Sequence, residues 1–213
     1  MAIQTETSEL PSSSTLNLVY RFSPELREAY GEVPQTIAFL YALRDHSTWT
    51  LDHSYRTGFI VTELGLYVGY PVAVRRLLWR AATNHDLGKL AIDPIIIDNP
   101  RGLDPSSKLA LRKHPRVGFD ILVDDDELAA MVMIAHHEFQ DDPYPRRGSR
   151  LDSDPVLKEY QMLLALSDGV DALRSRRPYK GSWSEGRTKL KLGKFFATDL
   201  INEALEAYAV VSP

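Results

Sequence analysis

Residues 84–90, NHDLGKL, place His85 and Asp86 directly after the apolar run LLWRAAT. Both side chains are costly to bury unless they are paired. One interpretation is a helix end, because Gly88 is typical of a left-handed C-terminal cap. It predicts that His85 and Asp86 lie in the last helical turn and pair with each other or with water. The other interpretation is a metal site, and this short motif alone does not decide between them.

Further ligand-type residues occur at similar positions. The chain has six histidines, and five of them lie at or near predicted helix ends or beside turn signals. His46 is the one that we expect to be an ordinary surface or core histidine. Imidazole and carboxylate together suit manganese, iron or zinc, whereas carboxylates alone suit magnesium or calcium. The residues that point to such a site are His53, His85, Asp86, His114, His136, His137, Asp168 and Asp171.

His136 and His137 are adjacent, and the apolar pattern before them predicts that both belong to a helix. Neighbouring side chains on a helix point about 100° apart. We therefore expect that these two rings do not bind one metal through one helix face. They would reach two different metals, or one metal and one phosphate.

The elements that must position these residues are predicted to be helices, because apolar residues recur at helical spacing and prolines open several segments. No strand-like alternation of useful length occurs, so the predicted fold class is all-α. A short helical turn is expected within 91–103, and a polar loop over 141–153. Helices are predicted from Ser23-Pro24 onward and over 34–45, 52–68, 71–86, 104–113, 115–122, 126–137, 154–173 and 197–209.

Composition restricts the classes of function. With 44% hydrophobic and 25% charged residues, the chain matches an ordinary soluble globular protein. A net charge of -4 without a long basic run argues against binding of a nucleic acid polymer or an anionic membrane. Without cysteine, any metal site must use His, Asp and Glu. No signal peptide or long apolar run is seen, so we expect a cytoplasmic protein, with a flexible tail over 1–18 and one domain over 19–213.

Six segments, in this order, resemble the HD-GYP subgroup of the HD-domain metal-dependent phosphohydrolases: DHSYRTG, NHDLGKLAIDPIII, LRKHPRVGFDIL, IAHHEFQDD, LSDGVDAL and RSRRPYK. The resemblance runs from about residue 50 into the C-terminal helix. It implies an HD-domain helical core with additional N- and C-terminal helices. It also implies a cluster of metal ions at the centre of that core.

The resemblance implies a role for each matching residue. The general HD ligands correspond to His53, His85, Asp86 and Asp168, and Asp86 is expected to bridge two metals. The additional HD-GYP ligands correspond to His114, His136 and His137. The positions that hold substrate phosphates correspond to Lys89, Arg177 and Lys180. Lys89 and Asp86 are therefore the candidate catalytic residues.

The implied activity is hydrolysis of cyclic di-GMP by a hydroxide that bridges two divalent ions, with iron or manganese favoured and zinc also suitable. One alternative is an HD phosphohydrolase that acts on another nucleotide, such as a mononucleotide or a (p)ppGpp-like molecule. A second is a catalytically silent signalling or interaction module. The resemblance is also compatible with a regulatory protein partner and with an oligomer.

Two departures from the family pattern affect these expectations. The family has D-G-x-G-Y-P after HHE, whereas this chain has DDPYP at 141–145, without either glycine. Because Asp and Pro cannot adopt the conformations open to glycine, the loop path should differ. Trp49 stands where the family often has a glutamate, which favours two metals over three. We expect the segment 141–150 to be a flap whose Arg146 and Arg147 contact a second phosphate; the alternative is an exposed polar loop.

Overall fold

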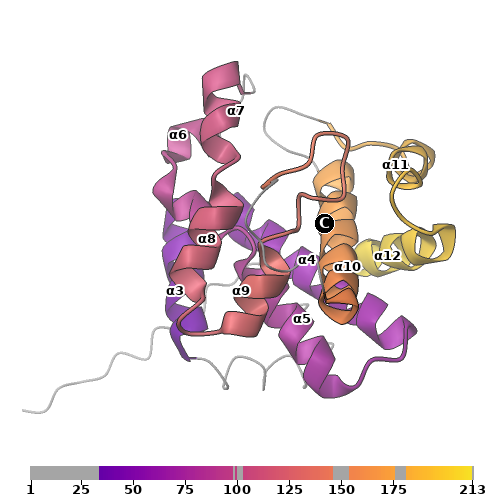
Figure 1. Ribbon diagram of the computed structural model, residues 1–213. Coiled ribbons are helices and arrows are strands. Elements are labelled where there is room, and N and C mark those ends of the chain that lie inside the picture. The colour runs from indigo at the N-terminus through magenta and orange to yellow at the C-terminus, as the bar shows by residue number, and fades with distance from the viewer. Residues whose placement is uncertain (1–33, 98, 100–102, 146–153, 176–180, 213) are drawn as a thin grey trace, which may run out of the picture.

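The computed structural model describes residues 34–97, 99, 103–145, 154–175 and 181–212 (Figure 1). Within these ranges every regular element is a helix and no strand occurs, so the predicted all-α class is confirmed. The predicted tail over 1–18 and the helix at Ser23-Pro24 lie outside the described residues. The domain boundaries, with one domain over 19–213, stay a prediction.

Helix α4 (Thr48–Tyr67) runs through the middle of the molecule and contacts α3 (Pro34–His46), α5 (Val72–Asn84), α10 (Pro155–Arg174) and α12 (Thr198–Val211). It begins four residues before the predicted start at 52, because Ser47 accepts a hydrogen bond from the Thr50 N–H and caps the helix. A Cβ atom at Gly58 would lie 2.8 Å from the Trp79 ring. Gly58 therefore lets α4 and α5 approach closely.

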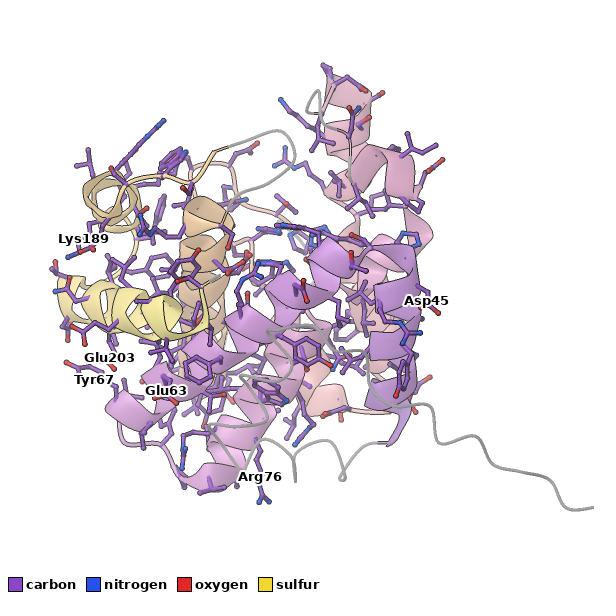
Figure 2. All side chains as sticks on the ribbon, turned by 180° about the vertical axis from the view of Figure 1, so that it is seen from behind. Asp45, Glu63, Tyr67, Arg76, Lys189 and Glu203 are labelled. Atoms are coloured by element: carbon purple, nitrogen blue, oxygen red, sulfur yellow. The ribbon has the colours of Figure 1, made fainter. Side chains whose placement is uncertain are left out.

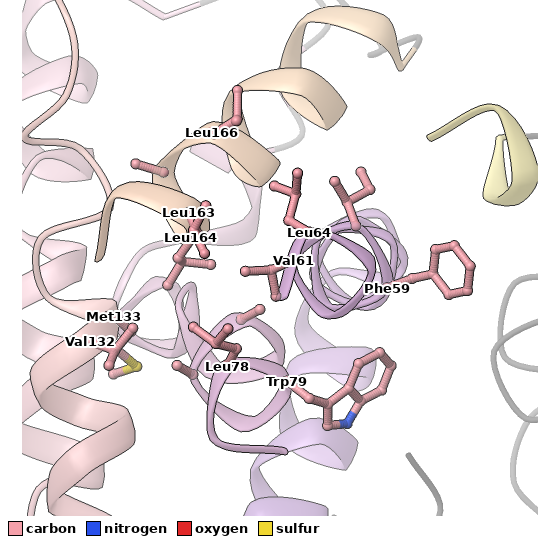
Figure 3. Packing of buried hydrophobic residues seen from close by; sticks show 14 of the residues in the cluster. Phe59, Val61, Leu64, Leu78, Trp79, Val132, Met133, Leu163, Leu164 and Leu166 are labelled. Atoms are coloured by element: carbon pink, nitrogen blue, oxygen red, sulfur yellow. The ribbon is translucent and has the colours of Figure 1, made fainter. Parts of the chain in front are cut away.

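The core lies between α4, α5, α10 and α9 (Glu127–Met133). Figure 3 shows Leu64 of α4, Leu78 of α5, Leu164 of α10 and Met133 of α9 directed toward one another. All four side chains are fully buried. Burial of each such side chain stabilises the fold by roughly 1.5–3 kcal/mol before the entropy cost of folding is subtracted. This packing fixes the helix ends at which the polar residues lie.

The helices α6 (Pro94–Ile97), α7 (Pro105–Leu111) and α8 (His114–Leu122) extend along one side of the molecule, opposite α11 (Glu185–Leu192) and α12 (Figure 1). Asp104 caps α7 by accepting hydrogen bonds from the N–H groups of Ser106 and Ser107. The 3₁₀ helix η1 (Leu87–Ala91) packs directly on α8. A Cβ atom at Gly88 would lie 1.9 Å from the His114 carbonyl oxygen, so only glycine fits there.

Two sequence predictions about elements are wrong, and one helix was not predicted. Helix α5 ends at Asn84, so His85 and Asp86 lie in the tight connection to η1 and not in the last helical turn. Helix α9 ends at Met133, which places His136 and His137 in the turns that follow it. Helix α11 was not predicted, because only Thr188 and Leu192 of its residues are buried and its apolar signal is correspondingly weak.

Charged side chains from several helices lie at the surface. Figure 2 shows the labelled charged side chains of Asp45, Glu63, Arg76, Lys189 and Glu203 at the edge of the molecule. In the part of the chain that the structure describes, no helix combines the length and the apolar character needed to cross a membrane.

Candidate metal centre

Seven predicted ligands converge where α4, α8 and α10 meet the segments that follow α5 and α9. Six of them are buried, and the His137 side chain is 22% exposed. Sets of three donor atoms lie within 4.8 Å of one another, which is close enough for each set to hold one ion. These sets are His53, His85 and Asp86; His85, His136 and Asp168; and His114, His136 and His137.

The first group surrounds the carboxylates of Asp86 and Asp168. His53 Nε2 lies 3.1 Å from Asp168 Oδ1 and 3.8 Å from Asp86 Oδ2. His85 Nε2 lies 3.5 Å from Asp86 Oδ2 and 4.0 Å from Asp168 Oδ1. The side chains come from α4, from the connection after α5 and from α10, so three separate helices position one group of donors.

The second group lies on the other side of Asp86. His114 Nε2 is 3.3 Å from Asp86 Oδ1 and 3.1 Å from His136 Nε2. His137 Nδ1 is 3.9 Å from Asp168 Oδ2. Asp86 Oδ2 therefore faces His53 and His85, and Oδ1 faces His114, an arrangement that would allow the carboxylate to bridge two ions.

Hydrogen bonds to backbone carbonyls set the orientation of three of these imidazoles. The Nδ1 distances are 2.6 Å from His85 to Ala82 O, 2.6 Å from His114 to Leu111 O and 2.5 Å from His136 to Met133 O. A carbonyl can only accept, so each ring donates its Nδ1–H and presents an Nε2 lone pair to the centre. In the neutral rings, the facing Nε2 atoms of His114 and His136 then have no proton to share. Two lone pairs at 3.1 Å repel each other unless a cation lies between them, so this donor set fits a metal ion.

For four of the five imidazoles and for Asp86, the pKa shifts favour the protonation states that bind metals. His53 is the exception: burial opposes its charged form, but the carboxylates of Asp168 and Asp171 raise its pKa. Burial lowers the pKa of His114 to about 3 and that of His137 to about 4, and it also lowers the pKa values of His85 and His136. Neutral imidazoles have the free lone pair that a metal needs. Burial alone would raise the pKa of the Asp86 carboxyl, but the adjacent Lys89 ammonium and the surrounding histidines hold it well below its usual range.

A second carboxylate orients His53. Asp171 Oδ2 accepts a hydrogen bond of 2.6 Å from His53 Nδ1, and Arg56 donates two hydrogen bonds to Asp171, at 2.6 and 3.0 Å. This arrangement directs His53 Nε2 to the centre, as carboxylate–histidine–metal groups do. The sequence placed Asp171 among the ligand-type residues but gave no reason to separate it from Asp168. The spacing of three residues between His53 and Arg56, which puts both on one face of α4, was the available signal.

A cavity of about 520 Å³ opens over this centre. Lys89 is the predicted phosphate-binding residue that the structure places here, and its Nζ lies 2.5 Å from Asp86 Oδ2. Arg146, Arg147, Arg177 and Lys180 lie outside the described residues, so their predicted contacts with phosphate stay predictions. Three further cationic side chains line the cavity and were not predicted from the sequence: Lys108, Arg112 and Lys191.

The structure corrects the expectation for His136 and His137 and agrees with that for His46. Since the two adjacent histidines lie beyond the end of α9, their rings are not held 100° apart. The ring centroids are 4.2 Å apart, and both residues belong to one set of three donors. His46 Nε2 lies 2.8 Å from the Ile92 carbonyl oxygen. This contact ties α3 to the segment after η1, and His46 belongs to none of the donor sets.

Comparison with known proteins agrees with this geometry. Residues 50–173 match the family model described as the HD domain. In the structural comparison, the HD domain of the phosphodiesterase PgpH from L. monocytogenes, solved with cyclic-di-AMP, gives a TM-score of 0.56 over 80% of this chain and 93% of that chain. At 15% identity, this likeness shows the fold alone.

Curated relatives are phosphodiesterases of cyclic dinucleotides. The chain is 26% identical over 189 residues to the cyclic di-GMP phosphodiesterase response regulator RpfG of Xanthomonas campestris. The matched region covers 84% of this chain and 48% of the relative. It is 29% identical over 163 residues to a cyclic di-GMP phosphodiesterase of Thermotoga maritima, over 75% of this chain and 43% of the relative. A 3'3'-cGAMP-specific phosphodiesterase of Vibrio cholerae is 27% identical over 191 residues. This match covers 85% of this chain and 35% of the relative.

The chain thus spans less than half the length of each of these relatives. The family match extends from the third residue of α4 to the penultimate residue of α10, and so contains all seven residues of the two ligand groups. The chain belongs to the HD-domain family, with HD-GYP phosphodiesterases of cyclic di-GMP and cGAMP as distant relatives.

Proposed function

We propose that this protein is a metal-dependent phosphodiesterase that hydrolyses cyclic di-GMP. The observation that carries the proposal is the position of Asp86 beneath an open cavity: its Oδ2 faces His53 and His85, and its Oδ1 faces His114. The predicted ligands would hold two divalent ions, iron or manganese and alternatively zinc. When bound, such ions supply Lewis acidity toward a phosphodiester and lower the pKa of water.

The chain's own residues have distinct tasks in this proposal. Asp86 lies between the two ligand groups and would bind an ion in each. Asp168 directs Oδ1 toward His53 of the first group and Oδ2 toward His137 of the second. Lys89 lies against Asp86 at the floor of the cavity, so its ammonium can neutralise charge on the phosphate that undergoes reaction. Its Nζ also lies 5.9 Å from the centroid of the Trp49 ring, which restricts where the flexible lysine can reach.

The cavity is consistent with a nucleotide ligand. Its volume of about 520 Å³ lies within the range of about 300–1,000 Å³ that is usual for small-molecule sites. Trp49 and Tyr144 line it and offer aromatic surfaces, and Lys108, Arg112 and Lys191 offer positive charge. These features suit a ligand that combines bases with phosphates, and they explain how a chain of net charge -4 can bind an anion locally.

A second candidate is hydrolysis of a different nucleotide. It is favoured by Asp141 and Asp142, which line the cavity and form ion pairs with its cations. Two carboxylates at this position would disfavour ligands with several charged phosphates and would change which nucleotide fits. The 3'3'-cGAMP specificity of a relative makes a second cyclic dinucleotide the first alternative to test.

The experiment is a nucleotide screen on protein whose metal content has been measured. Purified protein is loaded with Mn²⁺ or, without oxygen, with Fe²⁺, and its bound metal is quantified by elemental analysis. Cyclic di-GMP, 3'3'-cGAMP, cyclic di-AMP and mononucleotides are then supplied in parallel. We expect cyclic di-GMP to give the linear dinucleotide or GMP. Absence of hydrolysis of every nucleotide by protein with two ions bound would favour a silent binding module.

A further inference from the structure

His137 is held differently from the other imidazoles of the centre. His85, His114 and His136 each donate Nδ1–H to a backbone carbonyl, and His53 donates to Asp171. Among the residues that the structure describes, none forms a hydrogen bond with the His137 ring. Its Nδ1 lies 3.9 Å from Asp168 Oδ2, beyond hydrogen-bonding distance. Its orientation must therefore come from packing.

Tyr144 provides part of that packing, beside the His136 and His114 rings, whose centroids lie 4.2 and 5.2 Å from that of His137. The Tyr144 and His137 rings have centroids 4.6 Å apart and an angle of 31° between their planes, so they pack against each other in a tilted arrangement. Tyr144 also meets His114 edge-on, with centroids 6.3 Å apart. The Tyr144 N–H donates to the His137 carbonyl oxygen at 3.2 Å, which folds the chain back on itself. One tyrosine thus contacts two of the three imidazoles in the second group.

Arg112, at the C-terminal end of α7, lies over the same tyrosine. Its Cζ is 4.8 Å from the Tyr144 ring centroid, a cation–π distance. The guanidinium also pairs with the Asp142 carboxylate at 2.8 Å and donates to the Asp142 carbonyl oxygen at 3.3 Å. Arg112 therefore contacts the segment 141–145 at two places: the backbone carbonyl of Asp142 and the ring of Tyr144, which packs on His137.

We propose that Arg112 is a positioning residue for the metal centre: it holds Tyr144 against His137 and so fixes a ligand ring that has no hydrogen bond of its own. This inference rests on the metal centre proposed above and deepens it. It gives a function to the altered DDPYP segment, because Asp142 and Tyr144 are the two residues that Arg112 contacts. In this chain an ion pair supports the segment at a position where the family pattern has glycine.

The test measures metal affinity directly, without substrate. Metal-free protein is titrated with Mn²⁺, and bound and free ion are distinguished by electron paramagnetic resonance. Wild-type protein should bind two ions, and Arg112→Ala should bind one of them with affinity lower by about 10-fold, the smaller end of the effect of removing a residue that orients a ligand. Arg112→Lys should recover part of the loss, since lysine keeps the charge but not the planar group.

Three further variants separate this role from a general effect on folding. Tyr144→Phe keeps the ring and should bind both ions as the wild type does, whereas Tyr144→Leu should resemble Arg112→Ala. Arg116→Ala is the matched control, because Arg116 is an exposed arginine on the adjacent helix whose partners are Asp120 and Phe119. It should change neither site. Thermal unfolding of each metal-free variant verifies that the fold is retained.

Two results would overturn the inference. One is wild-type affinity for both ions in Arg112→Ala. The other is an equal loss in Tyr144→Phe, which would assign the effect to the hydroxyl group and not to the ring. Wild-type protein that binds no ion in the second group would overturn both this inference and the two-metal proposal. Binding of two ions without nucleotide hydrolysis would contradict only the proposed reaction, so the two failures are distinguishable.

Discussion

At the scale of the residue, the centre depends on how each ligand is held as much as on which ligands are present. Backbone carbonyls orient three imidazoles, Asp171 orients a fourth, and the fifth packs against Tyr144 and two neighbouring imidazoles. The ligand types and their approximate grouping were predictable from the sequence. The groups that orient the imidazoles were not predictable. Neither composition nor periodicity indicates that a histidine will contact the carbonyl three residues before it or a tyrosine seven residues after it.

Asp86 and Lys89 should respond differently to substitution. Asp86→Ala removes the oxygens that face both ligand groups, so we expect loss of bound metal and of activity together. Lys89→Met should keep the metal and weaken substrate binding by about 10-fold or more, because it removes a charge-assisted contact with phosphate. Metal content and KM measured on both variants test this. Full metal occupancy in Asp86→Ala would rule out the bridging role.

Asp171 should affect both stability and metal binding. Asp171→Asn removes the carboxylate charge that accepts both hydrogen bonds from the buried Arg56, which costs about 3–5 kcal/mol of stability. It also weakens the hydrogen bond that orients His53, which should lower metal affinity by about 10-fold or more. Thermal unfolding and Mn²⁺ titration at low temperature measure the two effects separately. Asp120→Asn, on the exposed face of α8, is the control, and equal behaviour of the two variants would refute the orienting role.

At the scale of the element, local signals located most helices, and the errors lie where such signals are weak. Asp104 and Asp154, each followed by proline, predicted the starts of α7 and α10. The end of α9 at Met133 carries no glycine or proline, so its apolar pattern was extended too far and His136 and His137 were placed on a helix. Helix α11 was missed because it buries little apolar surface.

The contact between η1 and α8 is the element-scale feature most sensitive to change. Gly88→Ala would place a Cβ atom 1.9 Å from the His114 carbonyl oxygen and 2.7 Å from the Gly118 nitrogen, and backbone atoms cannot move aside easily. We expect destabilisation of about 1–3 kcal/mol or more and weaker metal binding, because Asp86 and His114 flank this contact. Denaturant unfolding measures the change.

Gly186→Ala is the matched control for that substitution. Gly186 lies in the first turn of α11, and a Cβ atom there would meet nothing within 4 Å. Because alanine has room there and restricts the unfolded chain more than glycine does, this variant should be as stable as the wild type or more stable, by up to about 1 kcal/mol. If Gly88→Ala were as stable as the wild type, the close backbone contact between η1 and α8 at Gly88 would be contradicted.

At the scale of the whole molecule, apolar helices carry polar residues to one buried centre, and a cavity lined by several cationic side chains opens above it. The sequence predicted the all-α class, the HD-domain family and the residues that converge. It could not predict Lys108, Arg112 and Lys191 as neighbours of the centre, because tertiary packing brings them there from α7, the turn after it and α11.

The central claim is that two metal ions share Asp86. A crystal structure of Mn²⁺-loaded protein, with anomalous scattering recorded at the manganese edge, tests it most directly. We predict two anomalous peaks at about 3.5–4 Å separation, as in other two-metal sites, one beside His53 and His85 and the other beside His114 and His136, with Asp86 contacting both. A single peak, or peaks that leave Asp86 without a metal contact, would contradict the account.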